Sequence, residues 1–161
     1  MSLGLANHHL YLAKLVLQAW QRDRAAQAVP ALTLDQAYAP GVREHLVQAY
    51  GHFLSHVLDP TAAASDGAPP RSCDDLPPQV AGKAVPGEIR EFRQLEQEGW
   101  LAGLLAPLPQ GIPRPSRSGP GRDSLVAASS GSDWPQPDQA ESWCRRLQAT
   151  FERMSDSLDE C

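Results

Sequence analysis

Apolar residues recur along this chain at intervals of three and four, the period of an amphipathic α-helix, in four separate stretches. In the first stretch they form two adjacent rows, and together these rows make one broad apolar face. The rows predict a helix over residues 5–28, which Pro30 ends because proline cannot continue a helix. One row is Leu5, Leu12, Val16 and Ala19, and the other is Ala6, Leu10, Ala13, Leu17 and Trp20.

The second stretch predicts a helix over residues 34–58 with a kink near residue 40, where Pro40 removes a backbone N–H. Its apolar stripe is Val42, Leu46, Ala49, Tyr50, Phe53 and Val57. A third helical region covers residues 87–105, and Gly99 predicts a bend within it. The fourth helix covers residues 138–158 and has the clearest division into an apolar and a polar face.

Two connections rich in proline, glycine and serine separate these helices, over residues 60–86 and 107–136. Thirteen of the 15 prolines fall between residues 60 and 137, and neither connection shows a helical or strand period. We therefore expect both connections to be flexible and Cys73, within the first, to be exposed. The fold class expected for residues 1–161 is a single all-α domain that resembles a four-helix bundle.

The composition excludes some classes of protein and favours others. A net charge of −5, without a cluster of Lys and Arg, argues against nucleic-acid binding. No apolar run reaches the roughly 20 residues of a membrane span, and the N-terminus lacks the pattern of a signal peptide. Three cysteines without a paired spacing fit a reducing compartment. We therefore expect a cytoplasmic protein that binds neither nucleic acid nor membrane.

Three of these helical segments carry a family resemblance: LYLAKLVLQAW over residues 10–20, REHLVQAYGHFLSHV over residues 43–57 and EIREFRQLEQEGWLAGLL over residues 88–105. Together they resemble a family of small helical proteins of unknown function from Pseudomonas and related gammaproteobacteria. This resemblance implies a small cytoplasmic helical protein. It supplies no activity and no site residues.

Histidines provide the only group of candidate metal ligands. His45, His52 and His56 recur at spacings of seven and four on the second helix, which places them on one stripe. His9 approaches this stripe if the first two helices are antiparallel neighbours. A site of His9, His45, His52 and His56 would suit a divalent transition metal, because imidazole is a common ligand for zinc, nickel and iron.

Motifs of enzymes and cofactor sites are absent from the sequence, including phosphate-binding loops, nucleophile elbows and His-Glu-x-x-His. Our first hypothesis is therefore a non-enzymatic interaction or adaptor module without a cofactor, which binds a partner protein or itself. It predicts an apolar surface patch around residues 100–105. The alternative is a metal-binding helical bundle that acts as an enzyme or a sensor. Trp134 either packs against the entry of the last helix or anchors a partner.

Overall fold

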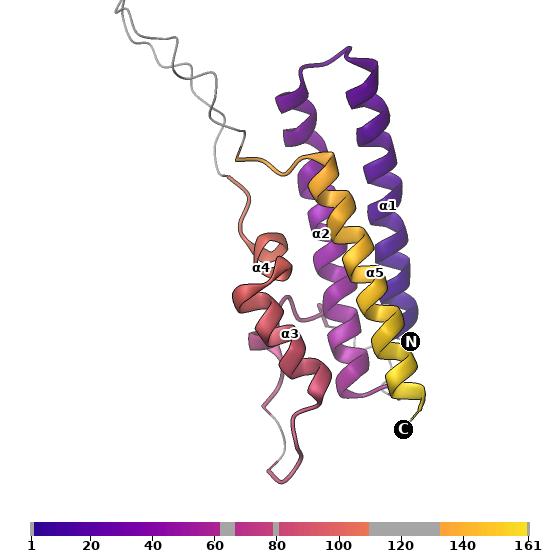
Figure 1. Cartoon of the computed structure of the whole chain (residues 1–161), viewed down its shortest axis with the longest axis vertical. Helices are drawn as coiled ribbons and strands as arrows, with labels where there is room; N and C mark the ends of the chain where they lie inside the picture. The colour runs from indigo at the N-terminus through magenta and orange to yellow at the C-terminus, as the bar shows by residue number, and fades with distance from the viewer. Residues whose placement is uncertain (1, 62–66, 79–80, 110–132, 161) are drawn as a thin grey trace, which may run out of the picture.

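The computed structural model describes residues 2–61, 67–78, 81–109 and 133–160, and all regular structure in these ranges is helical. Three long helices, α1 (Ser2–Ala26), α2 (Ala31–Leu58) and α5 (Pro137–Asp159), form the body of the molecule (Figure 1). The shorter α3 (Gly87–Glu98) and α4 (Trp100–Leu105) both contact α2. The all-α prediction is confirmed, and α3 and α4 together take the place of the fourth helix in a bundle.

The helix directions follow from the connections. A short turn joins α1 to α2 as an antiparallel hairpin, and Gln27, with a left-handed φ of 54°, ends α1. The N- and C-termini lie near each other, so α5 runs antiparallel to α1 and in the same direction as α2 (Figure 1). None of the described helices combines the length and the apolar character that crossing a bilayer requires.

The second predicted helix differs in detail from the structure, whereas the third region divides where the bend was predicted. The second begins at Ala31 and continues through Pro40 without a break. Pro40 costs a backbone hydrogen bond, but Ala39 and Val42 on either side of it are both buried, and this packing holds the helix together. The third region does divide at Gly99, whose N–H bonds to the carbonyl of Leu95 at 3.0 Å and closes α3.

The core lies where α2 meets the other helices. Phe53 on α2 stacks on Phe151 of α5 with ring centroids 4.1 Å apart, and it meets Phe92 of α3 edge-on at 6.0 Å. These aromatic contacts join three helices at one point and fix their separation. The core also includes Cys144 on α5, as the apolar stripe of that helix predicts.

The prediction that Cys73 is exposed is wrong, because residues 67–78 of the first connection, which we call the docked segment, lie against α2 and α3. The docked segment contains the short 3-10 helix η1 (Cys73–Asp75). The Cys73 side chain is only 1% exposed, and its backbone N–H donates to Glu96 Oε1 at 2.9 Å. The Tyr50 hydroxyl donates to the same oxygen at 2.5 Å. Proline-rich composition predicts flexibility, but it does not reveal these contacts with α2 and α3.

The second connection is described only at its two ends, and residues 110–132, which include most of the predicted flexible stretch, lie outside the described ranges. Trp134, just before α5, is partly buried and packs against the core. This contact favours the first of its two predicted roles, packing at the entry of the last helix.

Candidate functional site

The apolar patch predicted around residues 100–105 is not present. Leu101 and Leu104 of α4 are fully buried, and Trp100 and Leu105 are partly buried against the core. The prediction failed because α4 contacts both α2 and α5 and so covers its own apolar side chains.

The large apolar side chains that are exposed in the described part of the chain lie on the α1–α2 hairpin. Tyr11 and Leu15, one turn apart on α1, are 57% and 42% exposed. Val29 and Leu32, at the turn into α2, are 42% and 41% exposed. Two of these four side chains therefore occupy one face of α1, where a partner could cover them.

A groove of about 630 Å³ runs between α1 and α5 beside Tyr11, and we call it the α1–α5 groove. The N-terminal half of α1 lines one wall and the C-terminal half of α5 lines the other, so the groove follows two antiparallel helices. Its lining residues are Leu3, Asn7, Leu10, Tyr11 and Lys14 from α1, and Gln148, Phe151, Glu152, Ser155 and Asp156 from α5.

The lining residues of each wall recur at helical spacing, which places apolar residues at the bottom of the groove and polar residues at its edges. Leu10 and Phe151 are almost completely buried and form the floor, whereas Tyr11 stands at the rim. The groove therefore has an apolar floor and polar, solvent-exposed edges, which is the general form of a helix-binding groove.

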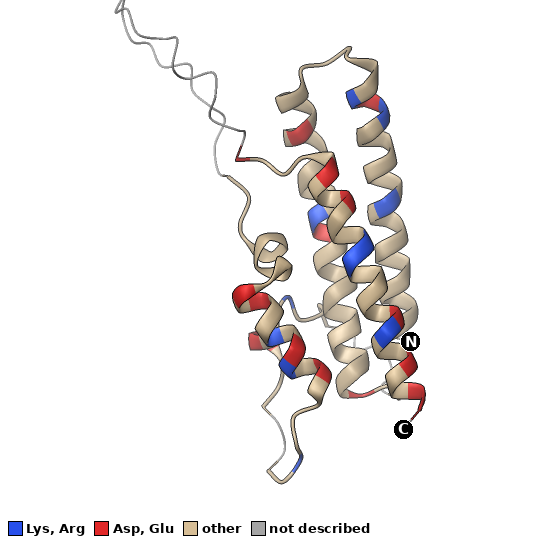
Figure 2. Cartoon of the chain, viewed as in Figure 1, with Lys and Arg blue, Asp and Glu red and all other residues tan. Residues whose placement is uncertain are grey.

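The charges of the groove are mainly acidic. Glu152 and Asp156 contribute two carboxylates, against the single ammonium group of Lys14. The Lys14 ammonium donates a hydrogen bond to Gln148 Oε1, and Gln148 Nε2 donates to Glu152 Oε1 at 2.9 Å. Acidic residues also occupy the last turns of α5 (Figure 2). The groove therefore favours a cationic ligand.

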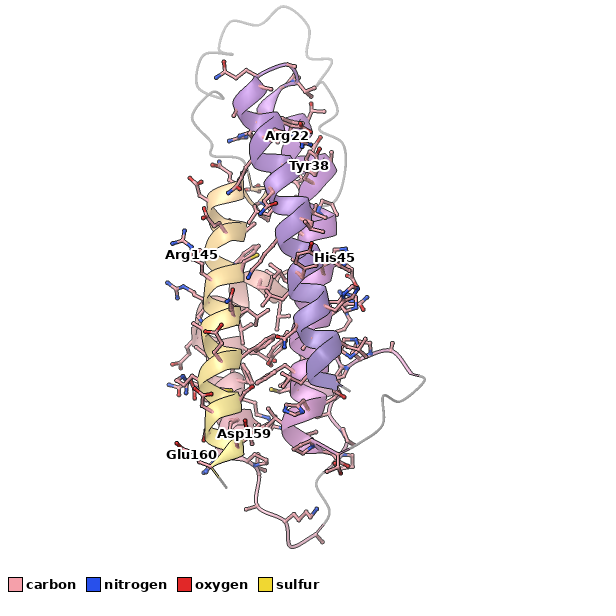
Figure 3. The ribbon with its side chains drawn as sticks, turned by 90° about the vertical axis from the view of Figure 1, so that its right-hand side faces the viewer. Arg22, Tyr38, His45, Arg145, Asp159 and Glu160 are labelled. Atoms are coloured by element: carbon pink, nitrogen blue, oxygen red, sulfur yellow. The ribbon has the colours of Figure 1, made fainter. Side chains whose placement is uncertain are left out.

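Three of the four histidines predicted as metal ligands lie together on the outer surface of the α1–α2 hairpin. His9 Nδ1 is 3.3 Å from His45 Nδ1, and the His9 ring is nearly parallel to that of His52 with centroids 5.5 Å apart. His8 lies 6.0 Å from His9 between ring centroids. In Figure 3, His45 points to the side of the hairpin that faces away from α5, so this histidine cluster (His8, His9, His45 and His52) is separate from the groove.

His56, the fourth predicted ligand, lies apart from this cluster. Its ring contacts Phe53, with centroids 6.0 Å apart, and its Nδ1 is buried without a hydrogen-bond partner. His56 follows His45 by 11 residues, which is about 16 Å along a helix axis. Helical spacing correctly placed His56 on the same side of α2 as His45 and His52. His56 is too far along the helix axis, however, to meet His9. Within the described ranges, no group of three or more His, Cys, Asp or Glu side chains is arranged to hold a metal ion.

Burial keeps several of these imidazoles neutral. It lowers the pKa of His9 below the ordinary value of 6.5, and the neighbouring His52, His45 and His8 lower that pKa further, while Glu44 opposes them. Burial also lowers the pKa values of His52 and His56. At neutral pH these three side chains are therefore uncharged, and in each ring one nitrogen carries a hydrogen while the other can accept a hydrogen bond.

Protein stability should decrease as the pH falls below about 6.5. A histidine with a lowered pKa in the folded state binds fewer protons there than in the unfolded chain, so acid favours unfolding. The measurement is urea unfolding at about pH 7.5 and about pH 5.5. Both values lie above the ordinary pKa of Glu44, 4.5, as well as above the value of about 2 to which its bond to Arg71 lowers it, so this carboxylate contributes little to the difference. The double variant His9→Gln/His52→Gln should reduce the difference between the two pH values, and an unchanged difference would exclude this cause.

The buried cysteines are poor candidates for nucleophiles. Burial raises the pKa of the Cys73 thiol to about 11, and it does the same for Cys144. Both side chains therefore remain protonated thiols at neutral pH, whereas nucleophilic cysteines need a lowered pKa. Cys161, the third cysteine, lies outside the described residues.

The exposed apolar side chains of α1 were missed at the sequence level, although a signal for them exists. Tyr11 and Leu15 fall outside both apolar rows predicted for the first helix. Large apolar residues beside the core rows widen the apolar face beyond what the hairpin can bury. Their position one turn apart is the signal that could have identified this surface.

A family model covers residues 1–161, and the chain belongs to that family, which is described as "Family of unknown function (DUF6586)". No curated protein and no solved structure matches the chain. Membership of this family does not assign an activity.

Proposed function

We propose that this member of a family of unknown function is a non-enzymatic interaction module whose α1–α5 groove binds an amphipathic helix of a partner protein. The observation that carries the proposal is the apolar floor of the groove beside an exposed aromatic ring: Leu10 and Phe151 lie below and Tyr11, 57% exposed, stands at the rim. Exposed tyrosines beside apolar hollows are typical anchors of protein interfaces, because they bury a large area and keep a hydroxyl for hydrogen bonding.

The size of the groove supports a helix as its ligand. The wall on α1 runs from Leu3 to Lys14, and these 11 residue steps correspond to about 16 Å of helix. A ligand helix of about three turns would cover this length, with apolar anchors at i, i+3 or i+4, and i+7.

Charge determines the kind of helix. Glu152 and Asp156 place two carboxylates along the α5 wall, and Lys14 is already bonded to Gln148. A partner helix with Lys or Arg flanking its apolar stripe would pair with these carboxylates, whereas an acidic helix would be repelled. We therefore propose a basic amphipathic helix as the ligand.

We further propose that the protein is bacterial and works in the cytoplasm. The free thiols of Cys73 and Cys144 support a reducing compartment, where unpaired cysteines persist. The bacterial assignment is supported by the resemblance of the three helical segments to proteins of Pseudomonas and its relatives.

A fluorescent peptide tests the groove directly. The peptide has about 14 residues, with leucine at i, i+3, i+4, i+7 and i+8 and lysine at most other positions. Fluorescence anisotropy should show saturable binding to the wild-type chain. Tyr11→Ala should weaken binding about tenfold or more, which corresponds to the loss of one interface anchor.

The matched control is Leu32→Ala, because Leu32 is an exposed apolar residue of the same hairpin outside the groove. This variant should bind the peptide as the wild type does. A version of the peptide with glutamate in place of lysine should bind much more weakly. Equal losses in Tyr11→Ala and Leu32→Ala, or equal binding of both peptides, would contradict the proposal.

A further inference from the structure

The closest contact within the histidine cluster joins two nitrogens of the same kind across two helices. His9 Nδ1 of α1 and His45 Nδ1 of α2 are 3.3 Å apart. Because α1 and α2 are packed along their whole length, the backbone holds both imidazoles in place. The two rings are tilted by 34° with centroids 5.5 Å apart, so their Nδ1 atoms face each other without stacking.

This separation matches the geometry of a metal ion. Two ligands of a tetrahedral zinc ion, with zinc–nitrogen bonds of about 2.0–2.1 Å, lie about 3.3–3.4 Å apart. The observed distance is at the long end for a hydrogen bond between nitrogens. We propose that His9 and His45 together bind a divalent transition metal ion, of which zinc is the best match, through their two Nδ1 atoms.

The surroundings of the pair suit such an ion. His52 lies beside His9 with the two ring planes only 14° apart, which restricts rotation of the His9 ring. The carboxylate of Glu44 is near enough to act electrostatically on His9. It is itself paired with Arg71, whose guanidinium donates two hydrogen bonds to it, of 2.8 and 2.9 Å.

Two protein ligands leave the other positions of a tetrahedral ion to water. Binding should therefore be reversible and weaker than in a structural site with four protein ligands. The ion would link α1 to α2, so it should also raise the midpoint of thermal unfolding as its concentration rises. His45 points away from α5 (Figure 3), and neither His9 nor His45 lines the α1–α5 groove, so this site and the groove can be tested separately.

Isothermal titration of the untagged full chain with zinc chloride at about pH 7.5 tests the site. The wild type should bind one zinc ion per chain. His9→Gln and His45→Gln should each weaken binding at least about tenfold, because each removes a direct ligand. His56→Gln is the matched control: it removes a histidine of the same α2 helix outside the cluster, and it should leave binding unchanged.

A second measurement uses the wild type alone and does not depend on how the variants fold. Nitrogen-15 NMR of the histidine side chains should show the Nδ1 signals of His9 and His45 shifting together during the zinc titration. Absence of zinc binding, or shifts confined to other histidines, would overturn the proposal. An equal loss of affinity in His56→Gln would also overturn it and would point instead to the larger four-histidine site.

Discussion

Replacing Asp35 by alanine should lower the free energy of unfolding by about 2–4 kcal/mol, the largest effect that we expect from any single substitution. The Asp35 side chain is buried at 2% exposure near the α1–α2 turn. One of its oxygens accepts a hydrogen bond from Trp20 Nε1 at 3.1 Å, and both accept from Arg24 Nη1 at 3.1 Å. Alanine would leave the buried indole N–H without a partner. Arg24 is partly exposed and can turn to water, which limits the cost.

Urea unfolding, monitored by circular dichroism, measures this effect. The variant Asp35→Asn separates the contribution of the hydrogen bond from that of the charge. The amide keeps an acceptor for Trp20 but loses the charge that holds Arg24, so its cost should be about half as large. Asp23→Ala is the control, because Asp23 accepts a hydrogen bond from Tyr38 at a more exposed position. That change should cost less than about 1 kcal/mol. Equal losses in Asp35→Ala and Asp23→Ala would show that the buried carboxylate has no special role.

Gly51→Ala should destabilise the protein by about 1–3 kcal/mol, although alanine is the better helix former. Gly51 lies inside α2, directly beneath the docked segment. A methyl group there would sit 1.9 Å from the carbonyl oxygen of Pro70 and 3.1 Å from the Pro69 side chain. Because the first of these atoms belongs to the backbone, no rotamer change relieves the clash. The substitution should displace the docked segment from α2.

Gly41→Ala is the matched control for this prediction. It lies in the same helix, and an added methyl group would meet only Val16 Cγ1 at 3.9 Å. Here the helix propensity of alanine should raise stability by about 0.5–1 kcal/mol. Opposite signs for the two substitutions would support the docked arrangement. A stabilising Gly51→Ala would show that residues 67–78 do not rest on α2. Hydrogen exchange of the Cys73 amide, which bonds to Glu96, reports the same displacement locally.

The sequence predicted the helices well because each has its own period of apolar residues, a local property. It failed for the docked segment because that contact depends on residues distant in the chain. Gly51 provides the space and Glu96 provides the acceptor, and neither is marked by a local pattern. Proline-rich composition disfavours long helices and strands, but a segment of this composition can still pack against a helix.

The histidine cluster was predicted in part for a related reason. Spacings of seven and four place His45, His52 and His56 on one stripe, and an antiparallel hairpin brings His9 to it. The level at which His9 meets the stripe depends on where the hairpin turns, at Gln27. That level falls between His45 and His52 and leaves His56 apart. The groove between α1 and α5 could not be predicted, because nothing in the local pattern states which helices become neighbours across a connection of 31 residues (106–136).

NMR chemical-shift mapping tests most directly whether the α1–α5 groove binds a basic amphipathic helix. The leucine–lysine peptide would be added to isotope-labelled full-length protein, and the backbone amide signals would be followed. We expect the largest shifts at the groove residues Asn7, Tyr11, Gln148 and Ser155, and none at the hairpin turn around Leu32. Shifts centred on the hairpin turn, or spread evenly over the helices, would contradict the proposed binding site.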